Sequence, residues 1–200
     1  MENLVENISK SVAIELLFEE MPTRPTANAI FREARKIFGD INIINRDEND
    51  IEFSVDKFVA YNEDNTTSPV VLAMGNITDF DDKVAVSEFE RTQIWNVANS
   101  EELLSKYKYA VKIWDVNAQK QIPKERAIML VDWLNVALKL YPKCQAIWIK
   151  SAGKLQLAQS IKNLKETGIV KYLYSMVNIR FFNVPNTNEF IVDSLGLANI

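Results

Sequence analysis

The chain has 200 residues, of which 48% are hydrophobic and 25% are charged, and its formal net charge is −4. These values are ordinary for one globular domain, so the composition excludes a disordered or low-complexity chain. The sequence contains no histidine and a single cysteine, Cys144. It therefore excludes Ser-His-Asp and Cys-His catalysis, an intrachain disulfide, and the usual zinc sites, which need several Cys or His ligands.

Charge and hydropathy also limit the location and the partners that we expect. The N-terminus lacks the basic and apolar run of a signal peptide, and no stretch of about 18 uncharged apolar residues predicts a transmembrane helix. A single cysteine is typical of a reducing compartment. Lys and Arg form no block of the kind that binds phosphates. We therefore expect a cytoplasmic protein that binds neither nucleic acid nor a membrane.

The first half of the chain combines strand patterns with one helix pattern. In chain order, the predicted elements are a strand at 11–19, a helix at 27–38, and strands at 41–44, 50–61 and 69–74. Thr26 precedes the helix as an N-cap residue, and Gly39 follows it as the residue that ends it. Residues 75–98 show no clear period, so we expect a long connection with some helix there.

The second half repeats this logic. Its predicted helices are at 101–106, 124–141 and 155–165. Its predicted strands are at 109–116, 146–149, 171–182 and 189–192. The helix at 124–141 is apolar around much of its circumference, which predicts that it is covered on more than one side. The chain finishes on the apolar residues 196–200, which we interpret as a docked last strand or as a truncated end.

These elements predict an α+β fold. Two βαβ-like halves form a mainly antiparallel or mixed sheet, with helices packed on one face. We expect a single domain over residues 1–200. Within it, pseudo-halves at 1–76 and 100–200 are joined by an irregular connection at 77–99.

Several segments of the second half carry a resemblance to a known family. They are the strand YAVKIWDV, the helix RAIMLVDWLNVAL, the strand and turn AIWIKSAG, the strand LYSMVNIRFF, and a closing SLGL. Over residues 109–200 the sequence resembles the bacterial domain-of-unknown-function family 4261. That family ends on Thr-x-Gly-Leu before Phe-Gly, whereas Ala198 and Asn199 replace the Phe-Gly here. The resemblance implies no catalytic residue, and it implies a bacterial protein of the kind found near polymorphic toxin systems, with an immunity or interaction role.

One acidic stretch and one tryptophan are the candidate partner-binding residues. They are Asp79, Asp81, Asp82, Glu88, Glu90 and Trp95. Oxygen ligands of this kind hold Mg²⁺ or Ca²⁺, but the spacing lacks the glycine turn and the late Glu of a calcium loop, so we favour a solvated loop. Trp95 lies in the irregular segment, and tryptophan is enriched in protein interfaces, so we expect it to contact a partner with the acidic residues as a polar rim.

Two further candidates have simpler interpretations. Residues 151–154 follow a predicted strand and precede a predicted helix, as a phosphate-binding loop does, but they contain only one of the two glycines of the Walker pattern. We favour a plain turn. Cys144 has no histidine to activate it, so we expect a buried and inert thiol.

The sequence therefore predicts a non-enzymatic cytoplasmic protein-interaction module without a cofactor. Its most specific form is an immunity-type protein that binds and neutralises a toxin, and the net acidity suits a basic toxin. Two alternatives stay open. One is a structural component of a bacterial secretion or phage-like assembly, and the other is an enzyme that uses carboxylates and a divalent metal.

Overall fold

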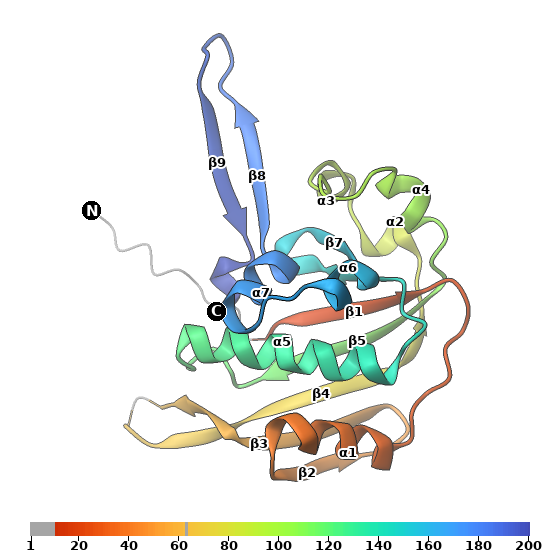
Figure 1. Ribbon diagram of the computed structural model, residues 1–200, viewed down its shortest axis with the longest axis vertical. Coiled ribbons are helices and arrows are strands. Elements are labelled where there is room, and N and C mark those ends of the chain that lie inside the picture. The colour runs from red at the N-terminus through yellow and green to blue at the C-terminus, as the bar shows by residue number, and fades with distance from the viewer. Residues whose placement is uncertain (1–10, 63) are drawn as a thin grey trace.

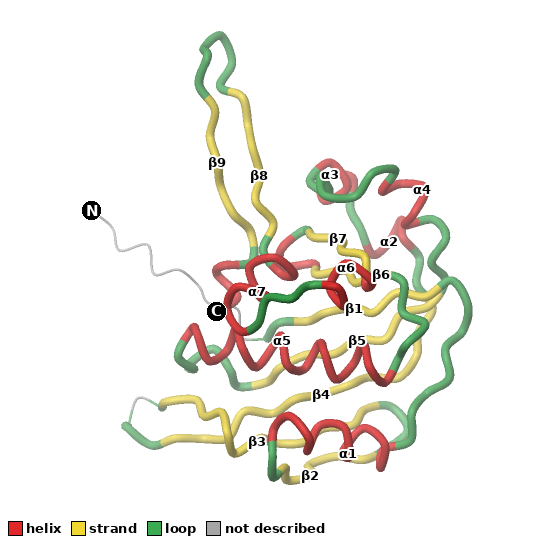
Figure 2. Tube along the Cα trace, in the orientation of Figure 1, coloured by secondary structure: helices red, strands yellow, loops and turns green. Residues whose placement is uncertain are grey.

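The computed structural model describes residues 11–62 and 64–200. Its main sheet has seven strands in the order β2-β3-β4-β5-β1-β6-β7, and each neighbouring pair is antiparallel (Figures 1 and 2). The strands are β1 Ala13–Phe18, β2 Ile41–Arg46, β3 Asp50–Tyr61, β4 Thr67–Asp79, β5 Tyr109–Val116, β6 Ala146–Ile149 and β7 Lys154–Leu157. The predicted α+β fold with a mainly antiparallel sheet is confirmed. β1, from the first half of the chain, lies between β5 and β6, which both come from the second half.

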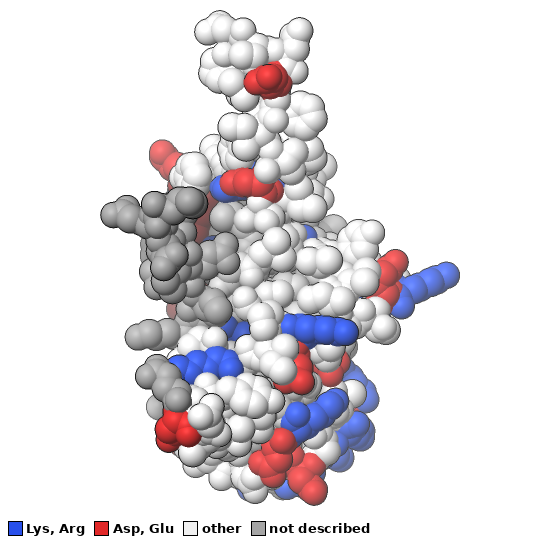
Figure 3. All heavy atoms as spheres, turned by 90° about the vertical axis from the view of Figure 1, so that its left-hand side faces the viewer, with Lys and Arg blue, Asp and Glu red and all other residues white. Residues whose placement is uncertain are grey.

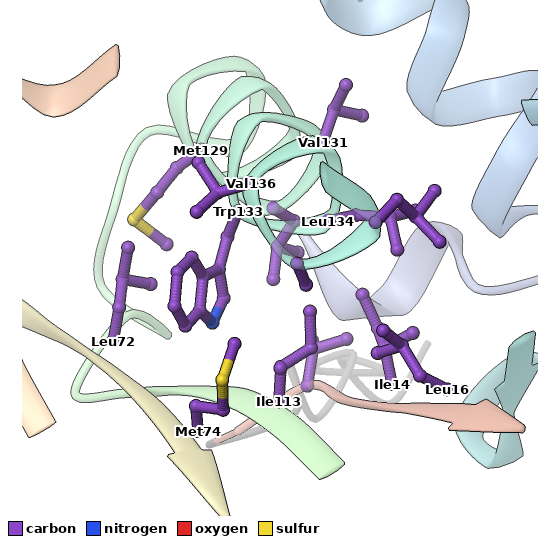
Figure 4. Packing of buried hydrophobic residues seen from close by; sticks show 14 of the residues in the cluster. Ile14, Leu16, Leu72, Met74, Ile113, Met129, Val131, Trp133, Leu134 and Val136 are labelled. Carbon is purple, nitrogen blue, oxygen red and sulfur yellow. The ribbon is translucent and has the colours of Figure 1, made fainter. Parts of the chain in front are cut away.

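The long helices cover one face of the sheet. They are α1 Ala27–Phe38, α5 Pro123–Leu140 and α7 Gly168–Met176. Figure 4 shows Trp133 of α5 pointing toward Leu72 and Met74 of the sheet, and its indole N–H donates to the backbone carbonyl of Ala73 at 3.2 Å. The ring is buried and its N–H is hydrogen-bonded, so this contact stabilises the packing of α5 on the sheet. As the apolar pattern of this segment predicts, α5 is covered on more than one side, since α1 and α7 both contact it.

Local signals in the sequence set the bounds of α1. The hydroxyl of Thr26 accepts a hydrogen bond from the backbone N–H of Ala29, as an N-cap residue does. Gly39 ends the helix with a φ of 78°, a conformation that costs glycine little because it has no Cβ. Both roles were predicted from the sequence.

Short helices cover the part of the opposite face of the sheet that β1, β5, β6 and β7 form. They are α2 Asp82–Ala85, α3 Glu88–Thr92 and α4 Ser100–Leu104. Val86, Ile94 and Leu104 from this segment form a second hydrophobic cluster with Leu17 and Trp148 of the sheet. Successive residues of β1 point to opposite faces, and Leu16, Leu17 and Phe18 are all buried because both faces of the sheet are covered there. The long helices therefore lie on one face, as expected, while part of the segment at 77–99 is an ordered cover for the other.

The prediction for residues 155–182 was wrong in two places. The predicted helix at 155–165 begins as β7, and only α6 Ala158–Asn163 is helical. The predicted strand at 171–182 is α7 followed by a shorter strand, β8 Asn178–Asn183. In α7 the buried residues Tyr172, Ser175 and Met176 recur at helical spacing, and packing against α5 decides the structure over the strand propensity of its aromatic residues.

The last strands form a separate hairpin. β8 pairs with β9 Phe190–Leu195 in an antiparallel two-stranded sheet that projects from the rest of the molecule (Figure 1). We call residues 178–195 the arm. The chain then makes a short 3₁₀ turn, Leu197–Asn199, in which Asn199 is buried and donates to the hydroxyl of Ser151 at 2.9 Å. The expected docked last strand is thus a docked turn. Ser151, the residue that it contacts, belongs to another 3₁₀ turn, Lys150–Ala152.

Candidate interaction surface

The predicted acidic residues are used largely within their own segment. The carboxylate of Asp81 caps α2 by accepting from the backbone N–H of Lys83 at 3.0 Å. Glu90 forms a capping box with Ser87 at the start of α3. Asp82 pairs with Arg91 at 2.9 Å. Asp and Glu at the start of a helix accept hydrogen bonds from the free backbone N–H groups there, so Asp81 and Glu90 stabilise the short helices α2 and α3.

The other two acidic residues, Asp79 and Glu88, are exposed. Asp79 is the last residue of β4, and Glu88 lines a shallow depression beside Arg91. In the residues that the structure describes, no group of three or more Asp, Glu, Cys or His could hold a metal ion.

Trp95 lies at the base of the arm. Its indole is 47% exposed and donates to the backbone carbonyl of Thr92 at 2.7 Å. Its ring centre lies 6.4 Å from that of Phe181, with the planes 24° apart, and 6.1 Å from that of Phe182. The structure thus brings Trp95 together with the aromatic residues of the arm, which the sequence analysis had not named as candidates.

The arm has an uncharged apolar face. The register of β8 and β9 places Ile179 opposite Ser194, Phe181 opposite Val192, and Asn183 opposite Phe190. Cross-strand partners point to the same side of a sheet, so these six residues share one face. We call its four large side chains, Ile179, Phe181, Phe190 and Val192, the apolar face of the arm. Each is at least half exposed.

The opposite face of the arm holds its two strands together. Arg180 and Asp193 stand opposite each other, and their side chains form two hydrogen bonds, one of them from Nε at 2.7 Å. The hydrogen bonds from Arg180 lower the pKa of Asp193. The guanidinium also lies 5.2 Å from the ring centre of Phe182, a cation–π contact. An isolated hairpin is marginally stable in water, so this pair helps to keep the arm formed.

Figure 3 shows how the charges are distributed over one side of the molecule. The arm, at the top of this view, is mainly white, whereas most of the blue and red side chains gather on the body below. Residues 178–195 contain only three charged residues, Arg180, Glu189 and Asp193. Protein interfaces are depleted in charge at their centre and enriched in aromatic residues, so the composition of the arm is that of an interface core.

An open pocket of about 300 Å³ lies at the base of the arm, and we call it the base pocket. It is lined by Trp95, Asn96, Lys154, Leu173, Tyr174, Val177, Asn178, Ile179 and Phe181. Most of the lining is apolar or aromatic and continues the apolar face of the arm.

Lys154 anchors the floor of this pocket. Its ammonium donates to the backbone carbonyls of Tyr174 at 2.8 Å and Val177 at 2.6 Å, where α7 ends. A cation suits the negative end of a helix dipole. Burial lowers the pKa of Lys154 to about 8. Residues 151–154 join β6 to β7, a strand-to-strand turn, so the strand-to-helix arrangement of a phosphate-binding loop is not present there.

Cys144 is buried as predicted. Burial raises the pKa of its thiol to about 12, so the reactive thiolate is scarce at neutral pH.

Comparisons with other proteins add no assignment. No protein-family model, curated protein or solved structure matches the chain. The resemblance to family 4261 therefore stays a prediction. No helix among residues 11–62 and 64–200 has the length and apolar character needed to span a membrane.

Proposed function

We propose that this chain is a protein-interaction module whose binding surface is the arm together with Trp95. The observation that carries the proposal is the set of large apolar side chains on a projecting hairpin, where they are at least half exposed. Leaving such a patch in water costs free energy, and contiguous exposed apolar patches mark interaction sites.

The composition of the surface supports binding to a protein. Trp95, Phe181 and Phe190 are its aromatic residues, and Asn183 and Ser194 are the polar residues of the same face of the arm. A few aromatic residues commonly carry most of the binding energy of a protein interface. Of the predicted partner-binding residues, only Trp95 belongs to the proposed surface. Asp81 and Glu90 cap helices and Asp82 pairs with Arg91, so these three carboxylates are engaged within residues 81–101.

The finer form of the proposal is an immunity-type role in which the bound protein is a toxin, and it depends on the resemblance to family 4261. A second candidate is a structural component of a secretion or phage-like assembly. It is favoured by the arm itself, since neither β8 nor β9 pairs with a strand of the main sheet in the described chain. Unpaired strand edges are templates for pairing with another subunit.

The proposal is tested by comparing two isoleucines that are equally exposed. Ile179 of the arm is 58% exposed and Ile44 of the edge strand β2 is 55% exposed. Tagged wild type, Ile179→Glu and Ile44→Glu are used as baits in the native cell, and each recovered protein is identified by mass spectrometry, with the untagged chain counted as a partner. The recovered partner is then purified, and its Kd for each variant is measured by calorimetry at low and high salt.

We expect Ile179→Glu to weaken binding at least about tenfold and Ile44→Glu to leave it unchanged, because only the first places a charge in the apolar contact. Binding through the apolar face should persist at high salt. A partner that Ile179→Glu retains in full, or whose affinity depends steeply on salt, would show that the arm is not the binding surface.

A further inference from the structure

We propose that the arm binds a second copy of this chain, and that two arms pack face to face and antiparallel, with Phe190 of each copy seated in the base pocket of the other. This inference rests on the proposed function, because it names the occupant of the same surface. It is argued from the positions of Phe190 and the pocket, from charge, and from area.

Phe190 and Ile179 belong to the two outer cross-strand pairs of the apolar face. Phe190 pairs with Asn183 at the end of the strands nearest the tip, and its ring centre lies 6.3 Å from that of Phe181, which lines the base pocket with Ile179. This face runs from Ile179 to Asn183, about 13 Å along β8, with the pair of Phe181 and Val192 in the middle. An antiparallel two-fold pairing of arms brings each tip to the base of the other arm. The exposed aromatic ring of one copy therefore meets the aromatic pocket of the other twice in one symmetric contact, as an isologous interface requires.

Charge favours a second copy as the occupant. A two-fold interface brings identical surfaces together, so any charge near the axis meets its own copy and repels it. The six positions of the apolar face are Ile, Phe, Asn, Phe, Val and Ser, and none of them is charged. The charged pair of the arm, Arg180 and Asp193, points to the opposite face.

The exposed area is sufficient for a dimer. Trp95, Ile179, Phe181, Phe190 and Val192 are 47% to 63% exposed. At about 200 Å² for a large apolar side chain, they present on the order of 500 Å² in each copy. If all of this area is covered, two copies together bury about 1,000 Å², which is the lower limit for a specific interface.

The first measurement is the mass of the purified full chain in solution, by size-exclusion chromatography with light scattering over a range of concentrations. We expect twice the monomer mass of 22.9 kDa for the wild type. Phe190→Glu should give the monomer, because it removes the aromatic ring from both contacts and sets a carboxylate against Ile179 of the other copy. Phe89→Glu is the matched control, since Phe89 is 65% exposed and Phe190 is 63% exposed. It should stay dimeric.

A cross-linking experiment tests the orientation. Val192 belongs to the middle pair of the apolar face, so in the antiparallel arrangement it lies next to the two-fold axis. Packed sheets lie about 10 Å apart, so a thiol-specific cross-linker of about that reach should join two copies of Val192→Cys. Ile44→Cys on β2 should give no product, and the inert Cys144 gives no background.

The outcomes separate this inference from the proposed function. A monomeric wild type at all concentrations overturns the inference, and the function still stands if an arm-dependent partner is captured. A dimer that Phe190→Glu leaves intact, or that fails to cross-link through Val192→Cys, overturns the arm-to-arm geometry. A monomer without an arm-dependent partner overturns both.

Discussion

Replacing Arg126 by Met would test the ion pair that joins β5 to α5 inside the core. Both Asp115 and Arg126 are at most 1% exposed. The carboxylate of Asp115 accepts from Nε of Arg126 at 2.8 Å and from Nη2 at 3.2 Å, and also from the backbone N–H of Val12 at 2.6 Å. Met retains most of the apolar stem of Arg but not its charge. Asp115 would then be a buried charge without its partner.

The expected loss is large compared with the stability of a domain. Removing one partner of a buried ion pair costs about 3–5 kcal/mol, whereas a whole domain is stable by about 5–15 kcal/mol. The free energy of unfolding is measured by urea denaturation, followed by circular dichroism, with the m-value as a check that the native and unfolded states are otherwise unchanged.

A double variant separates the buried charge from lost packing. Asp115→Leu with Arg126→Met removes both charges and leaves the Val12 N–H without its side-chain partner, which costs about 1–3 kcal/mol. The double variant should therefore be more stable than Arg126→Met alone. A single variant that loses less than about 1 kcal/mol, or a double variant less stable than the single, would refute the reasoning.

Three further predictions concern the base of the arm and two charged groups. Gly196→Ala should destabilise the protein by at least about 1–3 kcal/mol in thermal unfolding, because φ is 98° and a Cβ would lie 2.6 Å from a backbone carbonyl of α7; an unchanged Tm would contradict this. Hydrogen bonds from Lys139 and Lys36 hold the pKa of Glu33 at about 2, so its contribution is present above pH 4.5 and is lost as the pH falls toward 2. Glu33→Gln should thus be less stable at neutral pH, and the difference in Tm from wild type should shrink in acid. The pKa of Lys154 is lowered to about 8, so the unfolded chain binds more protons than the folded chain between pH 8 and 10.5. The stability of the wild type relative to Lys154→Met should therefore rise with pH over that window. A difference in urea midpoints that does not change with pH would count against a buried ammonium.

The elements that were predicted well carry their own local signals. The strand at Tyr109–Val116 and the helix at Ala27–Phe38 have the predicted bounds. Thr26 and Gly39 mark the ends of that helix through hydrogen bonding and backbone conformation, which depend only on neighbouring residues. One such signal was available but not used, since Ser87 and Glu90 have the spacing of a capping box and start α3.

The proposed binding surface depends on information that no local pattern contains. Alternating residues predict the final strand pair, but whether its apolar face is covered depends on where the rest of the chain lies. The error at residues 171–182 was of the same kind, because α7 is selected by its packing against α5. The acidic residues looked free in the sequence, whereas Asp82 is paired with Arg91, nine positions later.

The four tryptophans are spread over distinct parts of the molecule. Trp133 lies in the core beneath α5, Trp148 lies in the cluster beneath the short helices, and Trp95 stands at the base of the arm. Trp114, on β5, is half-buried, with the ammonium of Lys112 5.4 Å from its ring centre. Indole fluorescence responds to the local surroundings of the ring. Variants that keep one tryptophan each would therefore report the two helical layers and the arm as separate optical signals, and would show which of them loosens first during unfolding.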